Sequence, residues 1–181
     1  MASDSPVRRT CELRKGRFDD AGARYFVTLC VHDRIPVLRG NVASAIAAEI
    51  ESLHADGVIG DHALMIMPDH LHGLFTLGDR LSLDRTIARF KFKTRKALAD
   101  AGARWQPNYF ERRLRCSESS ERYAAYMFLN PYRAGLLSCS ERWPHWYTRK
   151  TGAWVFEGYL DESGCPPPAW VASVRDPCEE A

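Results

Sequence analysis

Two apolar segments that lie almost end to end place the strongest constraint on the fold of this chain. Residues 62–67 and 71–77 are dominated by large apolar side chains, over lengths that are typical of strands. Pro68 and Asp69 separate them, and because proline cannot donate to a strand ladder, this junction predicts a tight connection or an irregular strand. The middle of the chain is therefore expected to contain β-structure.

Strand-like and helix-like patterns alternate around this pair of segments. Residues 24–31 are rich in β-branched and aromatic side chains and are expected to form a strand. Apolar residues recur at helical spacing over residues 41–57, 82–101 and 118–129. This order of elements predicts an α+β sandwich in which the helices cover one face of a sheet.

The charge of the chain is unevenly distributed. Over its 181 residues the formal net charge is only +2, yet ten basic residues between Arg85 and Arg115 face two acidic ones. From Glu157 onward the balance reverses, with six acids against one arginine. A local excess of eight positive charges is typical of a surface that binds a polyanion such as nucleic acid, although a solvated helix face is the alternative.

The helix expected over residues 82–101 separates its side chains by chemistry, with Ser82 as a candidate cap. Its apolar residues fall within one arc of the helix, and four cations fall within another arc. We expect the first arc to be buried and the second to meet phosphates. The four cations are Arg85, Arg89, Lys93 and Lys96.

Aromatic residues and further arginines follow this helix. Aromatic faces can stack on unpaired bases, and neighbouring cations can contact the phosphate backbone, although core packing is an equally reasonable role for the aromatics. The candidate DNA-binding residues of this segment are Trp105, Tyr109, Phe110, Arg112, Arg113 and Arg115.

The ends of the chain differ in composition from its middle. We expect a polar extension over residues 1–23, one domain over residues 24–150, and an acidic, proline-rich tail over residues 151–181 that either covers a basic groove or is disordered. The six cysteines show no metal-binding spacing and are expected to be free thiols. Without a secretory signal or a long apolar run, a cytoplasmic protein that does not enter a membrane is expected.

The sequence His70-Leu71-His72 is the sharpest chemical feature. On an extended strand, side chains alternate, so both imidazoles point to one face while Leu71 points to the other. Two imidazoles at this spacing can converge on one divalent cation. Two histidines on one strand face can also be ordinary polar surface.

A second feature is Tyr126, with Asn130 four residues later on the same face of the expected helix. Ser117 is a candidate cap for this helix. The helix should stop or kink near Asn130, because Pro131 disfavours helical geometry in the residue before it. Amphipathic helices often bury a tyrosine, so the position of Tyr126, or of Tyr123 one turn earlier, does not by itself indicate catalysis.

Taken together, these features resemble a known family. The stretches Met67-Pro-Asp-His-Leu-His-Gly-Leu74, Trp105-Gln-Pro-Asn-Tyr-Phe-Glu111 and Tyr126-Met-Phe-Leu-Asn-Pro-Tyr-Arg-Ala-Gly135 occur in the order and spacing of REP-associated tyrosine transposases, a branch of the HUH single-tyrosine transposases. The resemblance covers about residues 24–148. Asp69 departs from the Asn or Glu that the family usually has there. The implied fold is a ferredoxin-like, RRM-like antiparallel sheet with packed helices.

The resemblance also implies roles. His70 and His72 would be the metal ligands, with Asn130 as a third, and Mg²⁺ or Mn²⁺ suits such a nitrogen and oxygen set. Tyr126, in preference to Tyr123, would attack DNA to give a 5′-phosphotyrosine. The implied activity is cleavage and rejoining of single-stranded DNA beside a REP-type hairpin.

Two other functions compete with this one. A non-catalytic RRM-like module would bind nucleic acid without metal, and a metal-dependent hydrolase would use activated water and need no tyrosine. The resemblance further implies a monomer, with a dimer as the alternative, and a cytoplasmic protein associated with the nucleoid.

Overall fold

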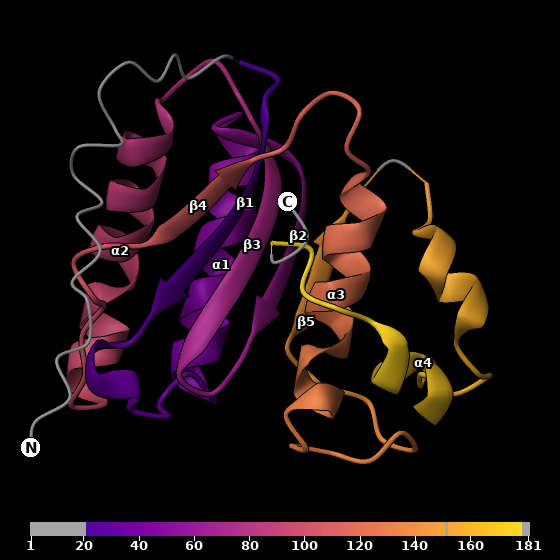
Figure 1. Cartoon of the computed structure of the whole chain (residues 1–181). Helices are drawn as coiled ribbons and strands as arrows, with labels where there is room; N and C mark the ends of the chain where they lie inside the picture. The colour runs from indigo at the N-terminus through magenta and orange to yellow at the C-terminus, as the bar shows by residue number, and fades with distance from the viewer. Residues whose placement is uncertain (1–20, 151, 179–181) are drawn as a thin grey trace, which may run out of the picture.

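The structure is a computed structural model that describes residues 21–150 and 152–178 (Figure 1). Strands and helices alternate through the first part of the chain, and short helices dominate its end. In chain order they are β1 (Arg24–Cys30), η2 (His32–Arg34), α1 (Asn41–Ala55), β2 (Ile59–Ile66), β3 (His70–Leu77), α2 (Leu83–Asp100), β4 (Phe110–Arg113), α3 (Ser120–Arg133), β5 (Trp146–Arg149), η3 (Val155–Tyr159) and α4 (Pro168–Ser173).

One antiparallel sheet of five strands, in the order β4-β1-β3-β2-β5, organises the molecule. The two apolar segments of the sequence are its neighbouring strands β2 and β3, and the Pro68–Asp69 junction is the tight connection between them. Strand β3 also pairs with the whole length of β1, with Cys30 opposite His70 and Arg24 opposite Thr76. The α+β class and the antiparallel sheet are confirmed.

The helices cover both faces of this sheet, and not one face as the element order suggested. Helices α1 and α2 pack on one face, and α3 packs on the other, as Figure 1 shows. The reason is the alternation of apolar residues along β3, where Leu71 and Phe75 join the core under α1 and α2 while Leu74 joins the core under α3. We refer to these as the α1/α2 face and the α3 face.

Helix α3 differs from its expected boundaries at both ends. Its cap is Ser119, whose hydroxyl accepts a hydrogen bond from the backbone of Glu121, and not Ser117. The helix continues through Pro131 to Arg133. A proline inside a helix costs about 3 kcal/mol, and here the burial of its neighbours Leu129 and Tyr132 in the core of the α3 face offsets that cost.

The C-terminal residues are packed and not a free tail. Phe156 and Trp170 stack around Phe128 of α3, with ring centroids 5.2 and 6.4 Å from that of Phe128. The backbone N–H of Phe156 also donates to Glu121 at 2.7 Å. The expectation of a disordered tail is therefore wrong for residues 152–178, because its aromatic residues complete the core of the α3 face. Residues 151 and 179–181 lie outside the described part.

The structure also bears on the cysteines, the N-terminal extension and the question of a membrane-crossing helix. The described cysteines (Cys30, Cys116, Cys139, Cys165 and Cys178) are free thiols, as expected, and Cys11 lies outside the described residues. So does most of the polar extension over residues 1–23, of which only 21–23 are described. No helix in the described ranges is both long enough and apolar enough to cross a membrane.

Candidate active site

His70 and His72 project from the same side of β3 onto the α3 face. Their ring centroids lie 4.9 Å apart, and the rings are nearly perpendicular. The Nδ1 atom of His70 is 2.6 Å from a carboxylate oxygen of Asp69, and Nδ1 of His72 is 2.8 Å from the hydroxyl of Thr28 on β1. Because both Nδ1 atoms have partners, the Nε2 atom of each ring is the nitrogen left for another ligand.

Burial keeps this pair of imidazoles neutral. The pKa of His72 is lowered to about 3, first by burial and then by the neighbouring His70. Burial also lowers the pKa of His70, although the adjacent Asp69 opposes the shift. A neutral imidazole has a free lone pair at physiological pH, and this is the form that binds a metal.

Tyr126 reaches these histidines from α3. Its ring centroid is 6.0 Å from that of His72, and its hydroxyl donates to Oδ2 of Asp176 at 3.1 Å. The guanidinium of Arg133 lies 5.3 Å from the centre of the tyrosine ring. Burial, followed by the nearby carboxylate of Asp176, raises the pKa of Tyr126 to about 12. The phenol is therefore protonated in this arrangement.

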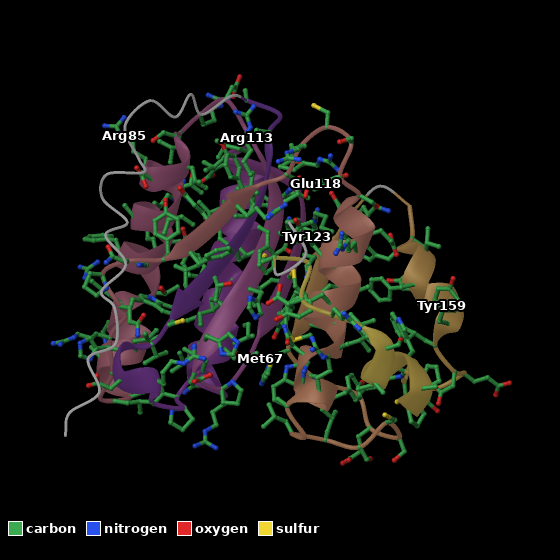
Figure 2. The ribbon with its side chains drawn as sticks, in the orientation of Figure 1. Met67, Arg85, Arg113, Glu118, Tyr123 and Tyr159 are labelled. Atoms are coloured by element: carbon green, nitrogen blue, oxygen red, sulfur yellow. The ribbon has the colours of Figure 1, made fainter. Side chains whose placement is uncertain are left out.

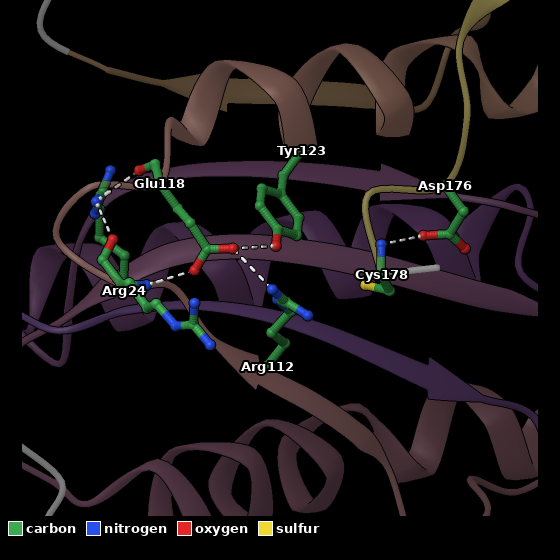
Figure 3. A network of polar contacts seen from close by, with 7 residues as sticks. Arg24, Arg112, Glu118, Tyr123, Asp176 and Cys178 are labelled. Atoms are coloured by element: carbon green, nitrogen blue, oxygen red, sulfur yellow. Dashed lines mark hydrogen bonds and ion pairs between the residues drawn. The ribbon is translucent and has the colours of Figure 1, made fainter. Parts of the chain in front are cut away.

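Tyr123 occupies a different environment. It is almost fully buried, and its hydroxyl donates to Oε1 of Glu118 at 3.2 Å (Figure 3). The same carboxylate oxygen accepts from Arg112, so the Tyr123 hydroxyl is held at a cluster near the start of α3. Among the tyrosines of the described residues, Tyr126 is the one in ring contact with His72.

Asn130 follows Tyr126 by one turn of α3 and is half-buried. Its amide nitrogen is buried and has no hydrogen-bond partner. An N–H donor is satisfied by an acceptor and not by a cation, so the atom of Asn130 that can bind a metal is its amide oxygen Oδ1. Two neutral imidazoles and an amide therefore fit a divalent cation. The described residues contain no cluster of three or more His, Cys, Asp or Glu side chains that would form a different metal site.

The four cations expected on one arc of α2 do not share one environment. Arg85 and Lys93 are exposed, and Figure 2 shows Arg85 on the outer side of the molecule, remote from α3. Lys96 is exposed and pairs with Asp100 at 2.7 Å. Arg89 corrects the expectation, because it does not point to solvent to meet phosphates. Its guanidinium bonds to Glu49, Ser52 and Asp56, which ties α2 to α1.

The aromatic segment also requires corrections. Trp105 is a core residue and not a stacking platform, because it is buried beside Phe90 and its indole N–H donates to Thr94 at 2.9 Å. Tyr109 is half-buried, and its hydroxyl donates to Asp84. Phe110 is exposed at the start of β4.

The arginines that follow also differ, because one is paired within the fold and the others are exposed. Arg112 is held by Glu118 at 2.8 Å and is mostly buried, so its charge is already neutralised inside the protein. Arg113 (labelled in Figure 2) and Arg115 are exposed. In the register of the sheet, Arg113 lies opposite Tyr25, at the end of β4 that is farther from Thr28 and His72. The expected DNA-binding set therefore contains both exposed cations and cations that are part of the fold.

Sequence reasoning missed several residues beside Tyr126 and the histidine pair. Arg133 lies seven residues after Tyr126, which is two helical turns, so its spacing was an available signal. Asp176 lies fifty residues away, and no local pattern indicated its contact. Thr28 is opposite His72 in the register of β1 and β3, which only the sheet topology reveals.

The fold and this group of residues define a class. A single antiparallel sheet carries two histidines on one strand, and a helix on the same face brings a tyrosine to them, which is the arrangement of the HUH single-tyrosine transposases. The chain belongs to the family of IS200-like transposases, whose family model matches residues 21–126. The match includes both histidines and ends at Tyr126, so Asn130, Arg133 and Asp176 lie beyond it.

Individual relatives agree with this membership. The REP-associated tyrosine transposase of Escherichia coli strain K12 is 23% identical over 132 residues, which cover 71% of this chain and 78% of the relative. The solved structure of a REP-associated tyrosine transposase bound to a REP hairpin matches with a TM-score of 0.60 and 20% identity, over 72% of this chain and 79% of that chain. The structural likeness supports the same fold.

Proposed function

We propose that this transposase cleaves single-stranded DNA with Tyr126 and holds the cut end as a 5′-phosphotyrosine. The observation that carries the proposal is the position of Tyr126 beside the two histidines. The ring centroids of Tyr126 and His72 are 6.0 Å apart. In the step, the Tyr126 oxygen forms a bond to phosphorus and the bond from phosphorus to the 3′-oxygen breaks. The phenol loses its proton and the 3′-oxygen gains one. One phosphodiester replaces another, so the strand can be rejoined by the reverse step.

His70, His72 and Asn130 would hold a Mn²⁺ or Mg²⁺ ion. Such an ion supplies Lewis-acid stabilisation of the charge that develops on the phosphate. The imidazoles suit Mn²⁺ better than Mg²⁺, because Mg²⁺ prefers oxygen ligands. Burial keeps both imidazole rings neutral. Asp69 contacts Nδ1 of His70 and Thr28 contacts Nδ1 of His72, and these contacts orient the rings.

Tyr126 must change its surroundings before it can attack. Its pKa of about 12 means that only a minute fraction is ionised at neutral pH. Asp176 accepts the phenol hydrogen bond and its charge disfavours the phenolate, whereas Arg133 favours the phenolate. Release of Asp176, combined with the approach of a phosphate that Arg133 can bind, would prepare the nucleophile.

DNA would be held by the exposed cations and not by the buried ones. Arg85, Lys93, Arg113 and Arg115 are exposed and therefore remain candidates for phosphate contacts. Lys96 remains a candidate as well, since its surface pair with Asp100 is weak and easily exchanged. Phe110 is 45% exposed on the α3 face of β4, opposite Thr28, and is a candidate to stack on an unpaired base.

The substrate proposed is a DNA hairpin of REP type with adjoining single-stranded DNA. The support is the relative whose solved structure is described as bound to a REP hairpin, together with the exposed cations above. Such a substrate would place the protein with the nucleoid in the cytoplasm. Because the two histidines and the tyrosine meet within one chain, we propose that a monomer is sufficient for cleavage.

The experiment compares Tyr126→Phe with Tyr123→Phe on a labelled hairpin that carries single-stranded flanks, in the presence of Mn²⁺. Tyr126→Phe should form no covalent protein–DNA adduct on a denaturing gel while still binding the hairpin, and Tyr123→Phe should retain the adduct. Unchanged adduct formation by Tyr126→Phe would refute its role. Cleavage without any adduct would indicate a hydrolase, and metal-independent binding without cleavage would indicate a binding module.

A further inference from the structure

Asp69 lies between an arginine and the first histidine of the candidate site. One carboxylate oxygen is 2.6 Å from Nδ1 of His70, and the other is 3.0 Å from Nε of Arg34. The guanidinium of Arg34 also reaches the sulfur of Cys30 at 3.0 Å. Both carboxylate oxygens are therefore engaged, one by the histidine and one by the arginine.

The segment that carries Arg34 has an unusual backbone. Asp33 and Arg34 both have φ of 56°, in the left-handed region that non-glycine residues rarely adopt. Two such residues in succession persist only when surrounding contacts hold them, and such outliers concentrate at functional sites. Here the Val31 N–H donates to the backbone oxygen of Asp69 at 2.9 Å, and the Leu38 N–H donates to that of Pro68 at 2.8 Å. The segment is thus anchored on the connection that precedes His70.

The chemistry of a carboxylate decides the state of the imidazole. An ionised carboxylate can only accept hydrogen bonds, so Nδ1 of His70 must carry the proton and Nε2 must carry the lone pair. Thr28 exerts no such control over His72, because a hydroxyl can donate or accept. The two histidines therefore differ in how firmly their tautomers are fixed.

We propose that Asp69 is a positioning residue for His70, and that Arg34 in turn fixes the orientation of Asp69. Asp69 selects the tautomer of His70 whose Nε2 can bind a cation, and hydrogen bonding to the carboxylate makes that nitrogen a stronger ligand. This inference rests on the proposed function, because it assigns His70 to a cation. Arg34 holds the carboxylate in place from the opposite side.

The first measurement is Mn²⁺ binding to the full chain without DNA, followed through the electron paramagnetic resonance signal of the free ion. Asp69→Ala should weaken binding by about 10–100-fold, the range found for such supporting contacts. Asp69→Asn keeps an oxygen acceptor and should lose much less. Arg34→Gly removes the guanidinium at a position whose backbone suits glycine, and should give an intermediate loss. Arg80→Ala, which removes another exposed arginine, paired with Asp79 and remote in sequence from the histidines, should bind as the wild type does.

The second measurement is the tautomer of His70, read from ¹⁵N chemical shifts of the imidazole nitrogens. The wild type should show the Nδ1–H form, and Asp69→Ala should show a mixture while its thermal unfolding remains cooperative. Wild-type Mn²⁺ affinity in Asp69→Ala, or an unchanged tautomer, would overturn the proposal, as would an equal loss in Arg80→Ala. Failure of the wild type to bind Mn²⁺ would refute the metal site in the proposed function, while the tautomer would still decide whether Asp69 positions His70.

Discussion

The two faces of the sheet are built for different purposes, although the same strands supply both. On the α1/α2 face, Leu71 and Phe75 of β3 join a continuous apolar core. On the α3 face, His72 lies between the ring of His70 on the same strand and the ring of Tyr126. The hydroxyl of Tyr126 in turn bonds to Asp176 of the C-terminal segment. One face is closed by apolar packing, whereas the other mixes aromatic packing with groups that can titrate or bind ligands.

This difference shows how a small domain can carry reactive groups without losing stability. A strand alternates its side chains between the two faces, so each reactive residue of β3 has an apolar neighbour directed to the opposite side. The apolar face can then hold the strand in place while the other face carries the polar groups. Stability and function should therefore respond separately to substitutions on the two faces.

The largest expected effect is that of His72→Ala on cleavage. Removal of one of the two proposed imidazole ligands should reduce adduct formation by about a thousandfold or more, since several kcal/mol of transition-state stabilisation would be lost. The measurement is the rate of adduct formation on a hairpin with Mn²⁺ present. His54→Ala, a histidine of α1 on the other side of the sheet that bonds to the backbone of Gly60, is the control and should cleave normally. Normal cleavage by His72→Ala would show that the histidines of the α3 face are not needed for the reaction.

The neighbouring substitution Leu71→Ala should have the opposite profile. Leu71 is 1% exposed in the core under α1 and α2, so its truncation should lower the free energy of unfolding by about 2–5 kcal/mol. Urea denaturation measures this loss. The fraction that remains folded should still form the covalent adduct, because the side chain points away from the histidines. A variant that is stable but inactive would show that the faces are coupled.

Residues whose placement follows from a local pattern could be predicted from the sequence. Residues that are placed by contacts with distant parts of the chain could not. Strand alternation placed His70 and His72 on one face, and helical spacing placed Tyr126 and Asn130 together. Arg89 pairs with Glu49 and Asp56, which lie 40 and 33 residues earlier in the chain. The charge pattern of α2 alone could not reveal these partners, and it therefore suggested a phosphate contact.

Long-range contacts also explain why the expectations for the end of the chain were wrong. The composition of the tail suggested disorder, because its acids and prolines are visible locally while the partners of its aromatic residues lie on α3. The strand β5 was missed because its four residues are too few to show a period. Pro131 predicted a helix end, and only tertiary packing explains why α3 continues.

A smaller effect is expected at Glu118, which joins the edge of the sheet to the start of α3. It accepts from Arg112, Tyr123 and the backbone of Arg115 (Figure 3), and these contacts, that of the Arg115 backbone first, lower the pKa of Glu118 to about 2. Because the folded-state pKa is depressed, the stabilisation is present above the usual value of 4.5 and is lost as the pH falls towards 2.

Glu118→Gln should therefore lower stability at neutral pH by about 1–2 kcal/mol, discounted for the partial exposure of the pair. It should also flatten the decline in stability between pH 4.5 and 2. Thermal unfolding at several pH values measures both effects. Glu157→Gln, an exposed acid of η3, should retain the wild-type decline. An unchanged pH dependence in Glu118→Gln would mean that this cluster does not stabilise the α3 face.

The smallest effect is expected at Asp176, where the C-terminal segment contacts the phenol of Tyr126. Asp176→Asn removes a negative charge that disfavours the phenolate, so the pKa of Tyr126 should fall below about 12. Burial is the larger cause of the raised pKa and is retained in the variant, so a fall of about one unit is expected, which corresponds to about tenfold more phenolate at neutral pH. The phenolate absorbance in the ultraviolet, titrated against pH with Tyr126→Phe as the reference, measures the change.

Cleavage by Asp176→Asn should rise by no more than this factor, and Glu157→Gln should leave both the pKa and the cleavage rate unchanged. A rise in cleavage without a fall in the pKa would mean that Asp176 acts by holding the C-terminal segment over Tyr126 and not by its charge. A pKa that remains near 12, with unchanged cleavage, would mean that burial alone keeps the phenol protonated. The reactive face would then be controlled by packing, as the α1/α2 face is, and the contrast between the two faces would be one of composition only.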